Sequence, residues 1–475
     1  MKNTLIILAL CIFSINSSAQ NSFITHYGEF TGQGNSLIIN SDGNYIIAGR
    51  KNQTSNFDQF CTYEINTNGN TLWLEHYGTD SLEQANQIIQ TIDGGYATIG
   101  LSSGYLSNYR NIYLVKTTNT GVVSWTKQIG GQGQENGNSI IQSFSGEYYI
   151  GGTSSYNSNG LFDFYLVKTN INGDTLWTKK YGGNQNEEAN SIRQTSDGGF
   201  VLGGYSESFG SKDFYLVKTN SNGDTLWTKH YGGNLVEISK SVRQTSDGGY
   251  IMTGYSESFG LSTENMYVVK TNSIGDTMWT KTYGQVGRYS RGNDIIQTGD
   301  GGFAITGLIK TASSNGGYDL YLVKIDASGN VQWEKEFKIE PTNTSFTSSD
   351  GRSILQTSDG GFAISGAWFS GSTFELLFIK TNSNGTVELS ELHTHTSFSI
   401  FPNPFCHSTT LQFENLQKEN YTLTLFDIEG RLVRTITNIV SDKIEIERNN
   451  LTNGIYYFQL RTEHEIRATG KVIIE

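Results

Sequence analysis

Short runs of alternating hydrophobic and polar residues fill the chain from about residue 22 to residue 390. The runs are three to five residues long, and Gly-containing turns or polar loops separate them. In one stretch they are residues 191–195, 200–202, 214–218 and 226–229. A period of two with tight Gly turns is typical of antiparallel β-strands, so each such stretch predicts four strands.

This four-strand unit repeats along the chain. Residues 189–233 nearly recur at 239–284, and a Trp marks the last strand of six units. These residues are Trp73, Trp125, Trp177, Trp227, Trp279 and Trp333, at separations of 52, 52, 50, 52 and 54. The turn after the first strand marks seven units, at Asp42, Asp93, Ser145, Asp197, Asp247, Asp300 and Asp359. We therefore expect seven repeats, each one supersecondary unit.

The sequence has no amphipathic helical pattern that could cover the faces of these sheets, so sheets must pack on sheets. Radial packing of four-stranded units leaves only short edges exposed. We predict an all-β fold, a seven-bladed β-propeller of four-stranded antiparallel blades at residues 20–390. Each Trp is expected to pack against a neighbouring blade.

The ends of the repeat array indicate how the ring closes. Residues 23–28 (FITHYG) resemble residues 227–232 (WTKHYG) of a last strand, yet no other strands precede them. We expect them to complete the seventh blade, whose other strands come from about residues 353–380. Residues 386–389 are the alternative closing strand.

A Gly pair that ends one strand and a Trp on the last strand resemble the repeats of kelch-type and quinoprotein-type propellers. The quinoprotein resemblance is partial, because that family places an Ala-x-Asp phrase where residues 216–219 read LVKT. This departure argues against a quinone, and we expect no cofactor.

The first residues have the order of a secretory signal peptide at residues 1–19: Lys2, an apolar run from Leu5 to Phe13, and small residues before a cleavage site after Ala19. A lipoprotein anchor at Cys11 is the alternative, although Leu10 stands where a small residue is preferred. No other stretch has the apolar length of a transmembrane helix.

The net charge of the chain limits the partners that it can bind. The net charge is −12 and the isoelectric point is about 5.2. Phosphate backbones and anionic membranes both favour clustered Lys and Arg, so we expect neither a nucleic-acid partner nor binding to anionic membranes. We expect a monomer.

The last 78 residues, 398–475, are a different domain, after a linker at 391–397. Alternating strands, a Pro-rich entry and an Asn-Gly turn predict a small Ig-like β-sandwich. Its phrases closely resemble the type A C-terminal sorting domain of the type IX secretion system of Bacteroidetes. The residues that carry the resemblance are Phe401, Pro402, Asn403, Pro404, Asp427, Gly430, Gly454, Tyr456 and Lys471.

This resemblance implies export by the signal peptide, then recognition of the C-terminal domain by the type IX machinery and its removal. The mature protein is then secreted or displayed at the cell surface, with surface lipopolysaccharide or a polysaccharide as a further partner. An Ig-like accessory domain without a sorting role is the alternative.

Candidate binding residues fall in the longer loops, which share one face of the predicted propeller. Four glutamates each lie ten residues after a Trp in the loop before the first strand: Glu83, Glu135, Glu187 and Glu237. They suit a cation or sugar hydroxyls, or else they accept backbone N–H bonds that fix their loops. A Gln repeated on the first strand, at Gln90, Gln142, Gln194, Gln244, Gln297 and Gln356, indicates hydrogen bonds between blades.

Residues that break the repeat are better candidates for recognition. Arg288, Tyr289 and Arg291 do so in one loop, and Trp368 with Phe369 in the last loop between second and third strands. Exposed loops without a ligand are the alternative. We find no catalytic or metal-binding motif. We therefore expect a secreted or surface-displayed binding or structural module, with an extracellular glycan lyase, hydrolase or quinoprotein-like oxidoreductase as the alternative.

Overall fold

The computed structural model describes residues 22–52, 58–78, 82–103, 109–156, 161–260, 263–312, 316–339, 347–369, 373–387, 398–413, 415, 418–427, 432–462 and 466–475. The expected signal peptide and linker lie outside these residues. The chain divides into two compact units, Met1–Val387 and Glu388–Glu475. The described residues of both units form strands and connecting segments, and no helix occurs among them.

Five sheets of the first unit have four antiparallel strands each, and each sheet comes from one continuous stretch of chain. The first is β5 (Leu82–Gln90), β6 (Tyr96–Ser103), β7 (Arg110–Thr117) and β8 (Val123–Ile129). The second is β9 (Glu135–Gln142), β10 (Tyr148–Ser154), β11 (Asp163–Thr169) and β12 (Thr175–Tyr181). The third is β13 (Glu187–Gln194), β14 (Phe200–Ser206), β15 (Asp213–Thr219) and β16 (Thr225–Tyr231). The fourth is β17 (Glu237–Gln244), β18 (Tyr250–Ser256), β19 (Asn265–Thr271) and β20 (Thr277–Tyr283). The fifth is β21 (Ser290–Gln297), β22 (Phe303–Lys310), β23 (Tyr318–Ile325) and β24 (Val331–Phe337).

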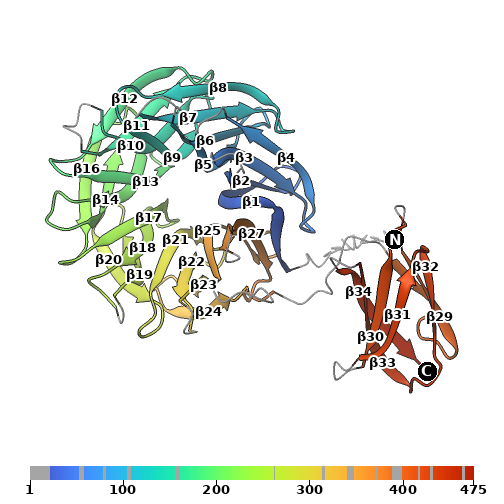
Figure 1. Ribbon diagram of the computed structural model, residues 1–475. Helices are drawn as coiled ribbons and strands as arrows, with labels where there is room; N and C mark the ends of the chain where they lie inside the picture. The colour runs from blue at the N-terminus through green and yellow to red at the C-terminus, as the bar shows by residue number, and fades with distance from the viewer. Residues whose placement is uncertain are drawn as a thin grey trace, which may run out of the picture. The chain divides into compact units, whose positions relative to one another are not determined.

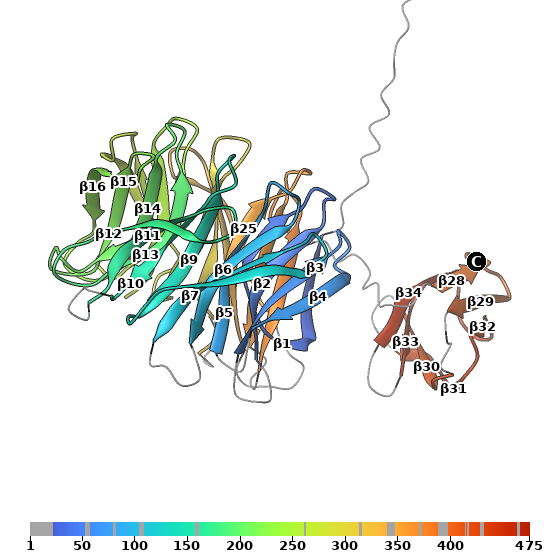
Figure 2. The same cartoon turned by 90° about the horizontal axis from the view of Figure 1, so that it is seen from above.

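The remaining strands of this unit form one seven-stranded sheet in the order β25-β26-β27-β1-β2-β3-β4. Its strands are β25 (Ser348–Gln356), β26 (Phe362–Phe369), β27 (Phe374–Thr381), β1 (Phe23–Ile39), β2 (Tyr45–Asn52), β3 (Asp58–Ile65) and β4 (Thr71–Tyr77). The start of β1 pairs with β27, and its second half pairs with β2. Strand β1 therefore joins two four-stranded halves. The sheets follow one another around a central axis in a propeller-like arrangement (Figure 1), and their first strands surround a channel at this axis. Figure 2 shows the same sheets from above.

Burial follows the position of a strand within its sheet. The second and third strands, such as β14 and β15, are buried along their whole length because sheets cover both of their faces. The first strand, such as β13, alternates buried with partly exposed positions, and the fourth, such as β16, is exposed at most positions. The first strand lines the channel and the fourth forms the rim.

The predicted packing of each Trp against a neighbouring sheet is confirmed for all six, five through an aromatic ring there and Trp177 through Gly223 and the adjoining core. The indole of Trp227 lies 5.7 Å from the ring of Tyr250 in the next sheet, and equivalent pairs involve Trp73, Trp125, Trp279 and Trp333. The same joint holds a hydrogen bond from the Tyr231 hydroxyl to the carbonyl of Gly275, at 2.7 Å. Gly275 has φ +83°, and a Cβ there would lie 2.8 Å from the Trp227 ring. Only Gly combines this backbone conformation with so close an approach.

The joint between the first and last repeats uses the same contacts. Residues Phe23 to Tyr27 pair with β27, as predicted for the closing strand. The Tyr27 hydroxyl donates to the Gly69 carbonyl at 2.7 Å, and a Cβ on Gly69 would lie 2.5 Å from the Phe23 ring. Phe23 therefore takes the place that Trp has in the other repeats.

Five of the turns between the first and second strands are tied to the third strand by a Lys–Asp ion pair of 2.8 to 3.0 Å. The pairs are Lys116–Asp93, Lys218–Asp197, Lys270–Asp247, Lys324–Asp300 and Lys380–Asp359, and each lysine is buried. Desolvation raises the pKa of each carboxyl group, but the lysine, a Thr hydroxyl and a Gly N–H together outweigh it. They lower the pKa of Asp197, Asp247 and Asp300 to about 2.

The second unit consists of two sheets that enclose one apolar core. The three-stranded sheet is β28 (Phe398–Phe401), β29 (Ser408–Phe413) and β32 (Lys443–Glu447). The four-stranded sheet is β31 (Leu432–Ile439), β30 (Tyr421–Phe426), β33 (Gly454–Arg461) and β34 (Ile466–Ile474). The core includes Leu411, Leu423, Ile446 and Phe458 from both sheets. The observed layers agree with the predicted sandwich.

Candidate functional site: the central channel

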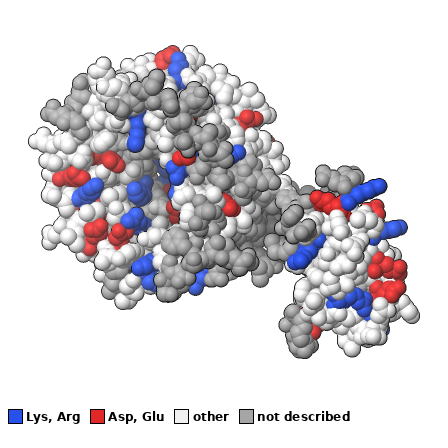
Figure 3. Space-filling model, viewed as in Figure 1, with Lys and Arg blue, Asp and Glu red and all other residues white. Residues whose placement is uncertain are grey.

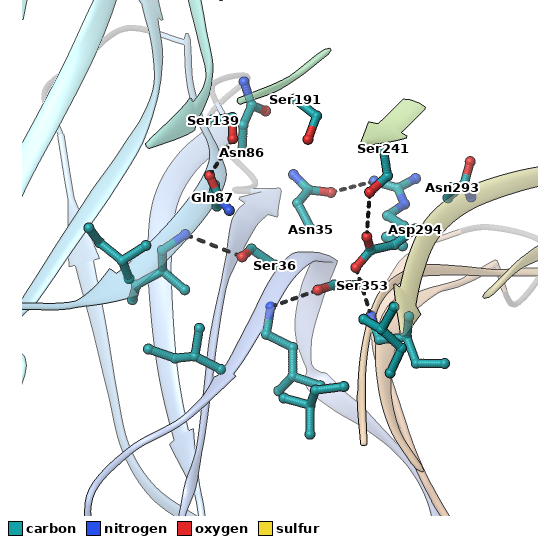
Figure 4. Close-up of a pocket in the computed structure, with 18 of the residues that line it drawn as sticks. Asn35, Ser36, Asn86, Gln87, Ser139, Ser191, Ser241, Asn293, Asp294 and Ser353 are labelled. Carbon is teal, nitrogen blue, oxygen red and sulfur yellow. Dashed lines mark hydrogen bonds between the residues drawn. The ribbon is translucent and has the colours of Figure 1, made fainter. Parts of the chain in front are cut away.

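The inner strands surround a cavity of about 630 Å³ at the centre of the first unit. They are β5, β9, β13, β17, β21, β25 and the second half of β1, and each contributes consecutive residues to the lining. A β-bulge in each inner strand leaves one residue unpaired. These residues line the cavity (Figure 4).

The bulge residue is Asn in five of the inner strands. Its side-chain N–H donates to a backbone carbonyl of the following repeat at 2.7 to 2.9 Å. The five residues are Asn35, Asn86, Asn138, Asn190 and Asn293. This series fixes adjacent sheets to one another and leaves amide oxygens at the channel.

The residue after the bulge forms a second series of contacts between repeats. Ser36 accepts from the N–H of Ile88 at 3.2 Å, and Gln87 accepts from the N–H of Ile140 at 2.6 Å. The Ser241 hydroxyl donates to Asp294 at 2.8 Å. The hydroxyl of Ser191, at the same position of β13, is buried and has no hydrogen-bond partner among the residues that the structure describes.

Four basic residues interrupt the regular lining. Lys240 and Arg352 occupy the bulge position in place of Asn, and Arg193 and Arg243 lie three positions further on. Other inner strands have aliphatic residues there: Ile38, Ile89, Ile141, Ile296 and Leu355. Asp294 is the acidic side chain of the lining. The channel of an acidic protein is therefore predominantly basic, and Lys and Arg side chains lie near the centre of the face in Figure 3.

Two of the arginines have carboxylate partners. Arg243 contacts Asp294 at 3.1 Å and also donates from Nε to a backbone carbonyl. Arg352 pairs with Asp350 at 3.0 Å and donates to the Asn35 side chain at 2.6 Å.

Arg193 is bound differently from these two. Its Nη1 donates to the Ile192 carbonyl at 2.6 Å and to the Ser139 hydroxyl at 3.2 Å. Its Nε is buried and unpartnered within the described part of the chain. Desolvation and the nearby Arg243 lower the pKa of Arg193 to about 9, and Asp294 opposes this shift.

The predicted glutamates lie away from the channel. We expected Glu83, Glu135, Glu187 and Glu237 in loops, but they lie at or next to the first residue of an inner strand, and all four are buried. Glu187 accepts from the Ser206 hydroxyl at 2.7 Å and from the Gly183 N–H at 3.0 Å. Glu135 and Glu237 have equivalent contacts, and Glu83 accepts from Ser102. This geometry is the one expected of the alternative, in which each Glu fixes its loop.

The residues that break the repeat are also held by protein groups. Arg288 donates through both terminal nitrogens to Glu336 at 2.8 Å, and Tyr289 lies 5.0 Å from the Lys310 ammonium. Arg291 binds Glu264 and lies over the Tyr255 ring. None of the three lines the channel cavity.

Trp368 lies in β26, whereas we expected it in a loop. Its side chain is 6% exposed and packs against His26 of β1, with ring centroids 4.4 Å apart. The closing strand therefore covers an aromatic residue that looked like a surface residue in the sequence.

The repeated Gln residues bond between sheets, as predicted, in four cases. Gln142, Gln244, Gln297 and Gln356 accept from a turn N–H of the preceding repeat at 2.8 to 2.9 Å.

The structure describes eight of the nine expected sorting residues. Asn403 accepts from the N–H of Ile473 at 2.8 Å and donates to the Lys471 carbonyl at 3.2 Å, which ties the Pro-rich entry to β34. Tyr456 is buried and donates to the Thr452 carbonyl. Phe401 and Lys471 are exposed, Pro402 and Pro404 flank Asn403, Asp427 follows β30 and Gly454 begins β33. Gly430 lies outside the described residues.

The described residues contain no group of three or more His, Cys, Asp or Glu side chains that could hold a metal ion. Within the same residues, no helix is long and apolar enough to cross a membrane.

The comparisons with known proteins identify the C-terminal segment. Residues 399–475 match the family described as the secretion system C-terminal sorting domain. The chain thus carries a type IX sorting domain, which indicates export to the cell surface or the extracellular space and interaction with the type IX secretion machinery. No curated protein matches the sequence significantly.

Several solved structures resemble the chain at low identity. The extracellular domain of a hybrid two-component system from B. thetaiotaomicron is 11% identical, with a TM-score of 0.42, and the match covers 95% of this chain and 57% of that one. The β-propeller domain of the Trilobed protease from Pyrococcus furiosus is 11% identical, with a TM-score of 0.42 and coverages of 77% and 100%. Virginiamycin B lyase from Staphylococcus aureus is 10% identical, with a TM-score of 0.44 and coverages of 76% and 99%. Similarity at this level carries no argument about the site.

Proposed function

We propose that this chain is an exported binding module whose ligand enters the central channel. In this proposal a seven-bladed β-propeller spans residues 20–390, and a linker at 391–397 joins it to an Ig-like sorting domain at 398–475. Residues 1–19 are the signal peptide. The sorting domain is removed after passage across the outer membrane, and the mature propeller is released or attached to surface lipopolysaccharide.

The observation that carries the binding role is the asymmetry of the channel lining. Identical repeats would place the same side chain at each level, as the five Asn residues do. Lys240, Arg352, Arg193 and Arg243 replace the repeated residue at positions where Asn or an aliphatic side chain satisfies the fold elsewhere. The four basic residues are only partly exposed, and partial desolvation of a charge costs free energy, so their presence in one cavity is better explained by recognition than by stability.

The experiment is a binding screen with product analysis. The secreted protein is presented with polysaccharides and small saccharides, and bound material is recovered and analysed for cleavage or oxidation. Binding without chemical change supports a binding module. Cleaved or oxidised product would instead identify an extracellular enzyme, and the absence of any ligand would contradict both.

A further inference from the structure

The lining between β13 and β17 differs from every other part of the channel. At the position after the bulge, the side chains of Ser36, Gln87, Ser139, Ser241, Asp294 and Ser353 each have a hydrogen-bond partner in another repeat. Ser191 is 4% exposed, and its hydroxyl has none among the residues described. An unpartnered buried hydroxyl costs free energy, and because Ser191 lines the cavity, a ligand in the channel can supply the missing partner.

Arg193 follows Ser191 by two positions on the same strand. Alternate residues of a strand point to the same side, so the two side chains lie roughly 7 Å apart along β13. The Arg193 Nε has no partner in the described part of the chain, and its Nη1 contacts only neutral oxygens. Asp294, the acidic residue of the lining, already receives hydrogen bonds from Arg243 and Ser241. The positive charge of Arg193 is therefore poorly compensated.

Lys240 is a second cation of the lining, on the neighbouring strand β17. It takes the bulge position of β17, where Asn would bond to the following repeat. Desolvation lowers the pKa of Lys240, and so do Arg291 and Lys212, although Glu188 opposes them. No hydrogen bond or ion pair of its ammonium occurs among the residues that the structure describes.

We propose that the channel binds an oxyanion group, a carboxylate, sulfate or phosphate, at Ser191 and Arg193, carried by a hydroxyl-rich small molecule such as a sugar acid. The hydroxyl and guanidinium donate to the anion, and Lys240 lies at the level of the sugar. The amide oxygens of Asn190 and Asn293 supply acceptors for hydroxyl groups. This inference deepens the proposed binding function and rests on it.

The test is a titration of the full secreted chain by calorimetry with D-glucuronate, glucose 6-phosphate and sodium sulfate, and with glucose as the neutral counterpart. We expect the anions to bind, glucose to bind at least about tenfold more weakly, and added salt to weaken anion binding. Arg193→Ile places in β13 the residue that β9 has at this position, so the variant should fold. We expect it to lower anion affinity at least about tenfold, a charged hydrogen bond being the strongest kind.

Ser191→Ala should lower the affinity by a smaller factor, and Arg193→Lys should retain part of it. Lys229→Gln, which removes an equal charge from the rim strand β16, should leave anion binding unchanged; circular dichroism and urea midpoints verify folding of each variant. The inference is overturned if no anion binds the native chain, or if Arg193→Ile binds anions as tightly as the native chain. A neutral saccharide that binds alone in the wider screen overturns this inference and leaves the proposed binding function intact.

Discussion

The joint that closes the first unit can be tested by removing a single hydroxyl group. Tyr27→Phe removes the hydroxyl that donates to the Gly69 carbonyl, and Tyr231→Phe removes its equivalent at the joint between β16 and the sheet β17–β20. Both bonds measure 2.7 Å. Burial raises the pKa of both phenols, so each remains a donor at every pH used for the measurement.

The size of the effect follows from burial. Loss of one neutral hydrogen bond lowers the free energy of unfolding by about 1 kcal/mol, and a buried acceptor left unpaired adds to this loss. Tyr231 is 8% exposed and Tyr27 is only partly buried. We therefore expect the free energy of unfolding to fall by about 1 kcal/mol in Tyr27→Phe and by about 1–2 kcal/mol in Tyr231→Phe.

Urea denaturation measures the stability of the two variants, and hydrogen exchange measures how readily their strands open. With a denaturant slope of about 3 kcal/mol/M or more, a loss of 1 kcal/mol lowers the urea midpoint by about 0.3 M or less. In Tyr27→Phe, faster exchange should appear first in the peptide that contains residues 23–27, because that segment is attached at the edge of β27. Tyr457→Phe, at an exposed Tyr of the second unit, is the control.

The reasoning is refuted if Tyr27→Phe leaves the midpoint and the exchange of residues 23–27 unchanged while Tyr231→Phe lowers the midpoint. That result would mean that β1 does not seal the joint in solution, and residues 386–389 would become the candidate closing strand.

Other predictions concern export, acid stability and the loops. Deletion of residues 397–475 should trap the first unit in the periplasm, so an unchanged extracellular yield on immunoblots would contradict the sorting role. The pKa of Asp197 is about 2 in the folded protein, below its unfolded value of about 4, so its ion pair stabilises the fold fully above pH 4 and is lost as the pH falls towards 2. Asp197→Asn should therefore reduce the fall in melting temperature on acidification. An unaltered dependence of the melting temperature on pH would count against this. Glu187→Gln should lower the melting temperature yet leave saccharide binding unchanged, because the carboxylate fixes a loop away from the channel. Gly385→Ala should lower the free energy of unfolding, measured by urea denaturation, by more than about 1 kcal/mol. The reason is that Gly385 has a φ of +69°, and a Cβ there would lie 2.4 Å from the Trp333 ring.

The strands of the first unit were largely predictable because their signal is local. Alternation and Gly turns gave a first strand at residues 191–195 in one repeat, whereas β13 spans Glu187–Gln194. The bulge at Asn190 explains the missed start, since an extra residue interrupts the period of two. The match of residues 23–28 to a last strand also worked, because Phe23 and Tyr27 keep the spacing of Trp227 and Tyr231.

The channel site was missed because radial packing brings together residues about one repeat apart. Arg193 lies next to Gln194, which the repeat pattern had singled out, and nothing local separates a channel residue from a rim residue. Alignment of the repeats with one another does indicate the site, because Arg193 and Arg243 stand at the position where other repeats have Ile141 and Ile296. Trp368 illustrates the opposite error, because the cover that His26 provides comes from the far end of the chain.

Strand β1 also sets the order in which the first unit can be completed. Its pairing partner β27 is among the last segments of that unit to be synthesised, and the contact of His26 with Glu375 spans 349 residues. The sheet that holds both strands cannot form until the segment through Thr381 is available for pairing. Residues 23–27 therefore remain without their strand partner until then, and during that time chaperones and proteases have access to them.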